Sequence, residues 1–144
     1  MKRLLTTLYS LLIFLGASSY HAHAQETPML NRIHWMEGTW TGVGYQEAMK
    51  AEWDIELRCK VDEGEFRISY PSISCQGEWQ LKNANNYRAE FLEIISEEQD
   101  NCGDVVRVVV TRIDDRFMSV AFFLPEIDDV VAAYTVLTRI EQKR

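Results

Sequence analysis

Histidine and proline are scarce in this sequence, and cysteine occurs only three times. Two of the three histidines fall in the first 24 residues, so His34 is the only one in the rest of the chain. Serine or cysteine nucleophiles usually need a histidine base, and zinc sites need several histidines and cysteines at characteristic spacings. We therefore expect no enzymatic activity, no metal and no other cofactor. His34 is expected to be an exposed or capping residue.

Long apolar runs are also missing, apart from "LLTTLYSLLIFLG" near the start. This run follows two basic residues and is shorter than the ~20 apolar residues of a membrane-spanning helix. Ala22 and Ala24 are small residues at the two positions that a signal peptidase reads. We predict a signal peptide over residues 1–24, cleaved before Gln25, and export to a periplasm or the cell exterior without membrane insertion. Residues 25–144 then form a single domain.

A basic surface is not available either. Without Lys2 and Arg3, 13 of the 15 basic residues remain against 22 acidic ones, which gives a formal charge of −9. Such a charge opposes binding to nucleic acid and to anionic membranes. Solubility is the simplest reason for the acidity, and the sequence does not identify a protein partner.

Alternation of apolar and polar residues dominates the chain after Gly38. In residues 51–61, the apolar members fall on one face and the charged members on the other. This period of two is typical of a strand with one buried and one wet face. The same analysis predicts eight strands, over residues 39–46, 51–61, 65–70, 75–81, 87–95, 105–113, 116–124 and 130–140.

Short connections between successive strands favour antiparallel neighbours in sequence order. Eight such strands can close on themselves and leave an interior wide enough for side chains or one small ligand. We predict an all-β, eight-stranded antiparallel up-and-down barrel. One short helix is expected before it, with Thr27 as cap, Pro28 in the first turn and Gly38 after the end.

Two glycines, Gly42 and Gly44, follow Trp40 closely and raise the question of a phosphate-binding loop. A dinucleotide fingerprint needs a third glycine at position 47, a preceding strand and a following helix. Position 47 is Glu47, no strand precedes the glycines, and the segment that follows them is predicted to be another strand instead of a helix. The pattern instead favours the start of a strand whose glycines allow tight coiling or close approach by a neighbour.

The residues "GTW", Gly38 to Trp40, stand at the entry to the first strand and resemble the signature of the calycin group. That group comprises the lipocalins, fatty-acid-binding proteins and nitrobindin-like barrels. The resemblance implies that Trp40 closes one end of the barrel beneath Arg139, the matching arginine near the end of the chain. An arginine over an indole contributes about 0.5–2 kcal/mol. The haem of nitrobindin-like proteins is not implied, because the C-terminal histidine is absent.

The three cysteines, Cys59, Cys75 and Cys102, allow three pairings if one bridge forms in an oxidising compartment. A second stretch, "YPSISC" followed by an F-x-E strand and a further cysteine, resembles a pattern in small uncharacterised exported β domains. That resemblance implies a Cys75–Cys102 bridge, which leaves Cys59 reduced as an apolar filler on an inward face. A Cys59–Cys75 bridge is the alternative.

Candidate binding residues lie on the predicted inner faces. Glu93 shares the face of Tyr87, Ala89 and Phe91, so its carboxyl is expected to point inward. There it would be hydrated or paired with an arginine near a barrel mouth, or it would anchor a hydroxyl or amine of a ligand. The residues predicted to line a ligand are Trp53, Phe66, Tyr70, Trp79, Phe91 and Glu93.

These observations lead to two interpretations of function. The first is an exported barrel that binds a small, partly apolar molecule in its interior, since such pockets are mostly apolar with a few polar groups. The second is a protein-binding module, an inhibitor or envelope accessory, whose aromatic residues simply fill a packed core. The sequence does not identify the ligand.

Overall fold

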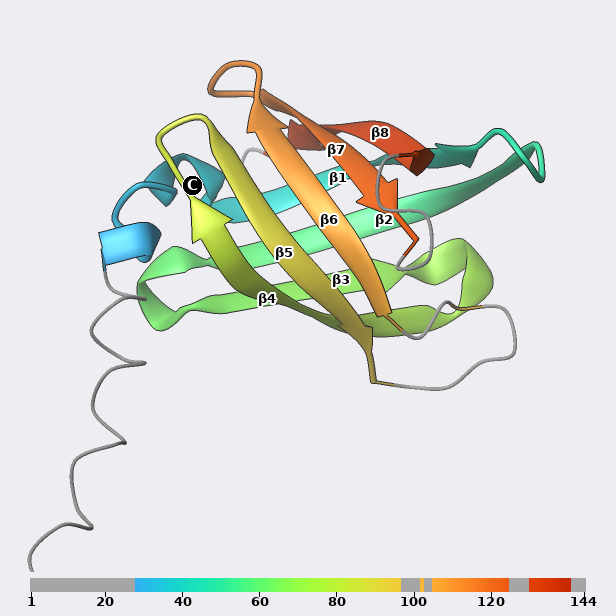
Figure 1. Ribbon diagram of the computed structural model, residues 1–144, viewed down its shortest axis with the longest axis horizontal. Coiled ribbons are helices and arrows are strands. Elements are labelled where there is room, and N and C mark those ends of the chain that lie inside the picture. The colour runs from blue at the N-terminus through green and yellow to red at the C-terminus, as the bar shows by residue number, and fades with distance from the viewer. Residues whose placement is uncertain (1–27, 97–101, 103–104, 125–129, 141–144) are drawn as a thin grey trace, which may run out of the picture.

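Eight strands wrap around a common interior in the computed structural model (Figure 1), which describes residues 28–96, 102, 105–124 and 130–140. The predicted signal peptide lies outside these residues. The strands are β1 (Gly38–Gln46), β2 (Ala51–Lys60), β3 (Glu65–Tyr70), β4 (Cys75–Ala84), β5 (Arg88–Ile95), β6 (Val105–Arg112), β7 (Phe117–Phe123) and β8 (Val131–Arg139). Three 3-10 helices accompany them: η1 (His34–Met36), η2 (Val61–Glu63) and η3 (Pro71–Ile73).

The sheet is a closed barrel in which every strand pairs antiparallel with its neighbours in the sequence. Closure is made by β1 and β8, where Trp40 lies opposite Arg139 and Tyr45 opposite Tyr134. Because the strands follow one another around the barrel, short hairpin connections are sufficient. The predicted fold class, an eight-stranded up-and-down antiparallel barrel, is confirmed.

The inner faces of the strands form one core, as the alternation of the sequence predicts. On β2, Ile55, Leu57 and Cys59 are buried, while the charged residues between them face outward. The predicted inward orientation of Tyr87 is wrong. Its side chain is 69% exposed, because Tyr87 precedes β5 instead of belonging to it.

A bulge in β4 changes which residues point inward. The pairing with β5 shifts register between Leu81 and Asn83. Trp79 and Ala84 are both buried although an odd number of positions separates them, which a regular strand does not permit. The turn predicted at residues 82–86 is therefore partly wrong, since β4 continues to Ala84.

The segment before β1 is helical in two short pieces. A helical turn covers residues 28–30, and η1 follows after a break. Backbone hydrogen bonds in this segment, such as Ile33 N–H to Leu30 O and Met36 N–H to Ile33 O, join residues three positions apart, as in a 3-10 helix. Gly38 begins β1 at a φ of 112°, a conformation that favours glycine, as expected for the residue that ends the helical segment.

Gly42 and Gly44 mark places where neighbours approach β1 closely. A Cβ on Gly42 would lie 2.7 Å from the backbone oxygen of Val136, and one on Gly44 would lie 2.7 Å from the Trp53 ring. Glycine at position 42 therefore lets β1 and β8 come together where the barrel closes. The predicted close approach at these glycines is confirmed.

Trp40 fills the end of the barrel that the N-terminal segment covers. Its ring is fully buried, its Nε1 donates a 2.7 Å hydrogen bond to the carbonyl of Met36, and the Arg139 guanidinium lies 4.5 Å from the ring centre. Arg139 Nη2 also donates to the carbonyl of Trp35 at 2.6 Å. One cluster thus joins the first strand, the last strand and η1.

A disulfide joins Cys75, at the start of β4, to Cys102, which lies beyond β5. The two Cα atoms are 6.4 Å apart. Cys59 is free and buried on the inner face of β2, and burial raises the pKa of its thiol. The pairing implied by the sequence pattern is confirmed, and the alternative Cys59–Cys75 bridge is wrong.

The close contact at Gly42 predicts that Gly42→Ala destabilises the barrel. The added methyl meets backbone, which cannot move aside as a side chain can, so we expect the free energy of unfolding to fall by about 1–3 kcal/mol. Val43→Ala, on the outer face of the same strand, should change it by less than about 1 kcal/mol. Urea denaturation of the three proteins measures both values, and equal stabilities would contradict the proposed close packing.

The cysteine arrangement predicts a simple alkylation result. Without reductant, the native protein should take up no iodoacetamide, because Cys59 is only 2% exposed, and the urea-unfolded protein should take up one equivalent on Cys59. The double variant Cys75→Ser/Cys102→Ser should lose about 3–4 kcal/mol of stability. Mass spectrometry of the tryptic peptides identifies the alkylated cysteine, and label on Cys75 in the unfolded protein would contradict the pairing.

Candidate functional site

Glu93 is a buried carboxylic acid inside the barrel. It lies on the inner face of β5 and is 4% exposed. Tyr70 Oη, from the end of β3, and Trp79 Nε1, from β4 directly across the hairpin, both donate hydrogen bonds to its Oε2, the second at 2.6 Å. The expected inward orientation is observed, and the donors to the carboxyl among the described residues are a phenol and an indole, not an arginine.

Burial and hydrogen bonding act on Glu93 in opposite directions. Loss of solvent raises the pKa of the carboxyl, while the bonds from Tyr70 and Trp79 lower it by stabilising the anion, and the net shift is upward. Burial, followed by the Glu93 charge, raises the pKa of Tyr70 well above its usual value. Tyr70 therefore remains a hydrogen-bond donor, and the Glu93 carboxyl titrates closer to neutrality than an exposed one.

Aromatic rings surround this acid. The ring centres of Phe66 and Phe91 are 5.0 Å apart, those of Trp79 and Phe91 are 5.4 Å apart, and those of Trp79 and Phe122 are 6.3 Å apart. These are the separations of tilted and edge-on aromatic pairs in direct contact. Four of the predicted lining residues besides Glu93, namely Phe66, Tyr70, Trp79 and Phe91, thus lie in one buried cluster.

Trp53 stands apart from that cluster. It is half-buried on β2 and lies against Gly44 of β1, and none of the ring contacts among the described residues includes it. Phe122 takes a place in the cluster that the sequence analysis did not assign. It lies on the inner face of β7, so the alternation of residues 116–124 was a usable signal.

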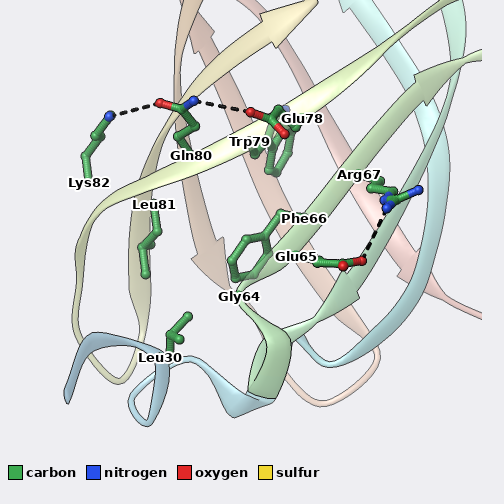
Figure 2. Close-up of a pocket in the computed structure, with 10 residues that line it drawn as sticks. All are labelled: Leu30, Gly64, Glu65, Phe66, Arg67, Glu78, Trp79, Gln80, Leu81 and Lys82. Atoms are coloured by element: carbon green, nitrogen blue, oxygen red, sulfur yellow. Dashed lines mark hydrogen bonds and ion pairs between the residues drawn. The ribbon is translucent and has the colours of Figure 1, made fainter. Parts of the chain in front are cut away.

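An opening in the barrel wall lies beside the cluster, between β3 and β4. Pairing of these strands runs from Tyr70–Cys75 to Arg67–Glu78 and continues no further, although β4 extends six residues beyond Glu78. Figure 2 shows the two strands diverging, with Leu30, Phe66 and Leu81 around the space between them. This space forms a surface pocket of about 280 Å³.

Apolar and charged side chains occupy different parts of this pocket. Leu30 from the N-terminal segment and Leu81 from β4 are partly buried, and Phe66 and Trp79 belong to the core. The charged and amide groups come from outward positions and form two connected sets, Glu65 with Arg67 and Glu78 with Gln80 and Lys82. The pocket therefore has an apolar inner wall and a polar rim. The alternation of apolar and polar residues does not predict this pocket, because it carries no sign of where two strands separate.

The described residues contain neither a group that could hold a metal ion nor a helix that could cross a membrane. Over residues 28–96, 102, 105–124 and 130–140, no group of three or more His, Cys, Asp or Glu side chains could hold a metal ion. His34 is exposed and lies 3.5 Å from Asp62. No helix in this described part of the chain is long and apolar enough to cross a membrane.

The chain was compared with known proteins. No family model matches it, and no curated protein matches it. Among solved structures it is similar to pallilysin, Tp0751, of Treponema pallidum, with a TM-score of 0.44 and 15% sequence identity. The similarity covers 83% of this chain and 97% of that one.

The buried acid predicts a characteristic pH dependence of stability. Because the pKa of Glu93 is raised on folding, the folded protein binds a proton at this site more tightly than the unfolded chain does. The contribution of Glu93 to stability therefore falls as the pH rises from 4.5, the usual pKa of the group, through the raised pKa of the folded state. Glu93→Gln should remove this contribution. The stability of the variant relative to wild type should grow across that window by about 1.4 kcal/mol for each unit of pKa shift.

Urea denaturation at a series of pH values measures this difference. Glu90→Gln, on the same strand but facing outward, makes the same charge change at the surface and should leave the pH trend of the wild type in place. A constant difference between Glu93→Gln and wild type at all pH values would contradict a raised pKa.

Proposed function

We propose that this protein is an exported, calycin-like barrel that binds a small, partly apolar molecule. The apolar part of the ligand enters between β3 and β4 and contacts Leu30, Leu81 and the edges of Phe66 and Trp79. The observation that carries this proposal is that the pocket at the opening is lined by two residues, Phe66 and Trp79, that also pack in the cluster around Glu93.

The opening is just below the usual size of a small-molecule site, and its lining combines apolar and polar groups. Small-molecule sites are commonly about 300–1,000 Å³ and mostly apolar, with a few polar groups that fix orientation. A pocket of about 280 Å³ accommodates a small molecule or one end of a longer one. The rim carries cations, Arg67 and Lys82, as well as carboxylates, so it favours a neutral or zwitterionic polar end over a strongly charged one.

Glu93 supplies the polar anchor in this proposal. Both donors bond Oε2, which leaves Oε1 without a donor among the described residues. A ligand hydroxyl or amine that passes Trp79 would donate a hydrogen bond to this carboxyl and offset the free-energy cost of burying it. Binding of an amine would also lower the pKa of Glu93, since a nearby cation stabilises the anion.

The alternative is a protein-binding module with a filled core and no small ligand. The ring contacts of 5.0 to 6.3 Å within the cluster favour it, because an interior ligand would have to displace these side chains. Binding at the opening requires less rearrangement than binding deep inside. Binding of an apolar probe at the β3–β4 opening distinguishes the two functions.

A Nile red titration tests the proposed site. We expect saturable fluorescence enhancement with wild type, and at least tenfold weaker binding to Leu81→Glu, which places a charge against the apolar wall. Ile113→Glu introduces the same charge at a site 55% exposed after β6 and should bind as wild type does. Circular dichroism and urea unfolding check that each variant is folded.

Dye binding elsewhere on the barrel is separated by a second variant. Tyr134→Ser alters an exposed apolar residue of β8, away from the opening, and should leave Nile red binding unchanged. Absence of saturable binding to the wild type, or equal binding to Leu81→Glu, would contradict the proposed pocket and favour the protein-binding alternative.

A further inference from the structure

The outer face of β1 and β8 carries several large, exposed apolar side chains. Val43, Tyr134 and Val136 are 54%, 54% and 53% exposed. The ring of Tyr45 lies 5.7 Å from that of Tyr134, edge to face. We call these four residues the β1–β8 patch.

Strand register makes the patch continuous. Tyr45 lies opposite Tyr134 and Thr41 opposite Thr138, and the same register sets Val43 opposite Val136. The Thr135 hydroxyl donates to the carbonyl of Val43 at 2.8 Å, which holds the two strands together at this point. The four side chains therefore form two adjoining cross-strand pairs on one surface.

Folding of the barrel does not account for these residues. The interior is filled from the alternate positions, where Leu137 is buried and the glycines at 42 and 44 admit neighbouring groups. Solvent-exposed strand faces are ordinarily polar, and a contiguous apolar group on such a face marks a surface that contacts something else.

Carboxylates border the patch on β2. Glu52 lies opposite Tyr45 and Asp54 opposite Val43, and both are exposed. In the described part of the chain neither carboxylate has an ion-pair partner, whereas Glu56, the next acidic residue on this face, is paired with Arg58 at 2.6 Å. The surface thus combines an apolar strip with a strip of unneutralised negative charge.

We propose that the β1–β8 patch is a docking surface for a polypeptide that presents lysine or arginine beside apolar side chains. The apolar side chains would cover Val43, Tyr134 and Val136, and the cations would meet Glu52 and Asp54. Charge decides between the possible occupants: a net charge of −7 opposes a second copy of this chain and an anionic membrane, and it attracts a cationic partner. This surface lies on β1, β2 and β8, apart from the β3–β4 opening.

Two synthetic peptides of 18 residues test the proposal, one of leucine and lysine patterned as an amphipathic helix, the other with glutamate replacing lysine. Fluorescence anisotropy should show binding of the lysine peptide, weakening as salt is raised, and no binding of the glutamate peptide. Tyr134→Ser/Val136→Ser should weaken binding of the lysine peptide at least tenfold. Glu52→Gln/Asp54→Asn should weaken it about fivefold and reduce its salt dependence.

The charge-matched control is Asp62→Asn/Glu63→Gln, in the η2 turn, which should bind as wild type does. Equal binding of the lysine peptide by all four proteins would overturn the proposal, because it would show attraction to net charge alone. Sedimentation as a dimer that Tyr134→Ser/Val136→Ser dissociates would also overturn it, in favour of a second copy. Co-flotation with vesicles containing phosphatidylserine would overturn it in favour of a membrane surface.

Discussion

The barrel depends on the contact between Trp40 and Arg139. The guanidinium lies over the buried indole and also bonds the carbonyl of Trp35, while the indole N–H bonds the carbonyl of Met36. These groups come from the two strands that close the sheet and from the segment that covers its end. Because closing eight strands brings together the two ends of the chain, this contact joins the closing strands to the base of the barrel. Gly42 allows the same two strands to meet at close range further along.

The apolar interior determines the pKa and the hydrogen-bond partners of Glu93. A closed, apolar barrel makes an ionised carboxyl costly, and among the described residues Tyr70 and Trp79 offset that cost with hydrogen bonds. Trp79 reaches Glu93 because the two residues are paired directly across the β4–β5 hairpin. The same indole borders the pocket between β3 and β4, so the acid and the surface are connected through one side chain. This connection is the basis of the proposed binding function.

Alternation in the sequence predicted most of the fold, because inward and outward positions differ in every strand. The barrel and its strand order follow from that pattern together with the short connections between strands, and the inward orientation of Glu93 follows from the pattern alone. Contacts that depend on strand register were not predicted. The bulge between Leu81 and Asn83 places Trp79 opposite Glu93, and nothing in the composition of β4 signals it. Separation of β3 from β4 is also invisible to periodicity, because it concerns backbone pairing instead of burial. Trp53 was grouped with the other aromatics by its inward position, but position along the strand places it against Gly44.

Separation of β3 from β4 has a consequence for how the barrel moves. Beyond Glu78, the residues of β4 are paired on the β5 side only, so no backbone pairing with β3 resists displacement of this part of β4. Local fluctuation concentrates where backbone hydrogen bonds are fewest. This end of β4 can therefore bend away from β3 without breaking any of the paired positions between the two strands.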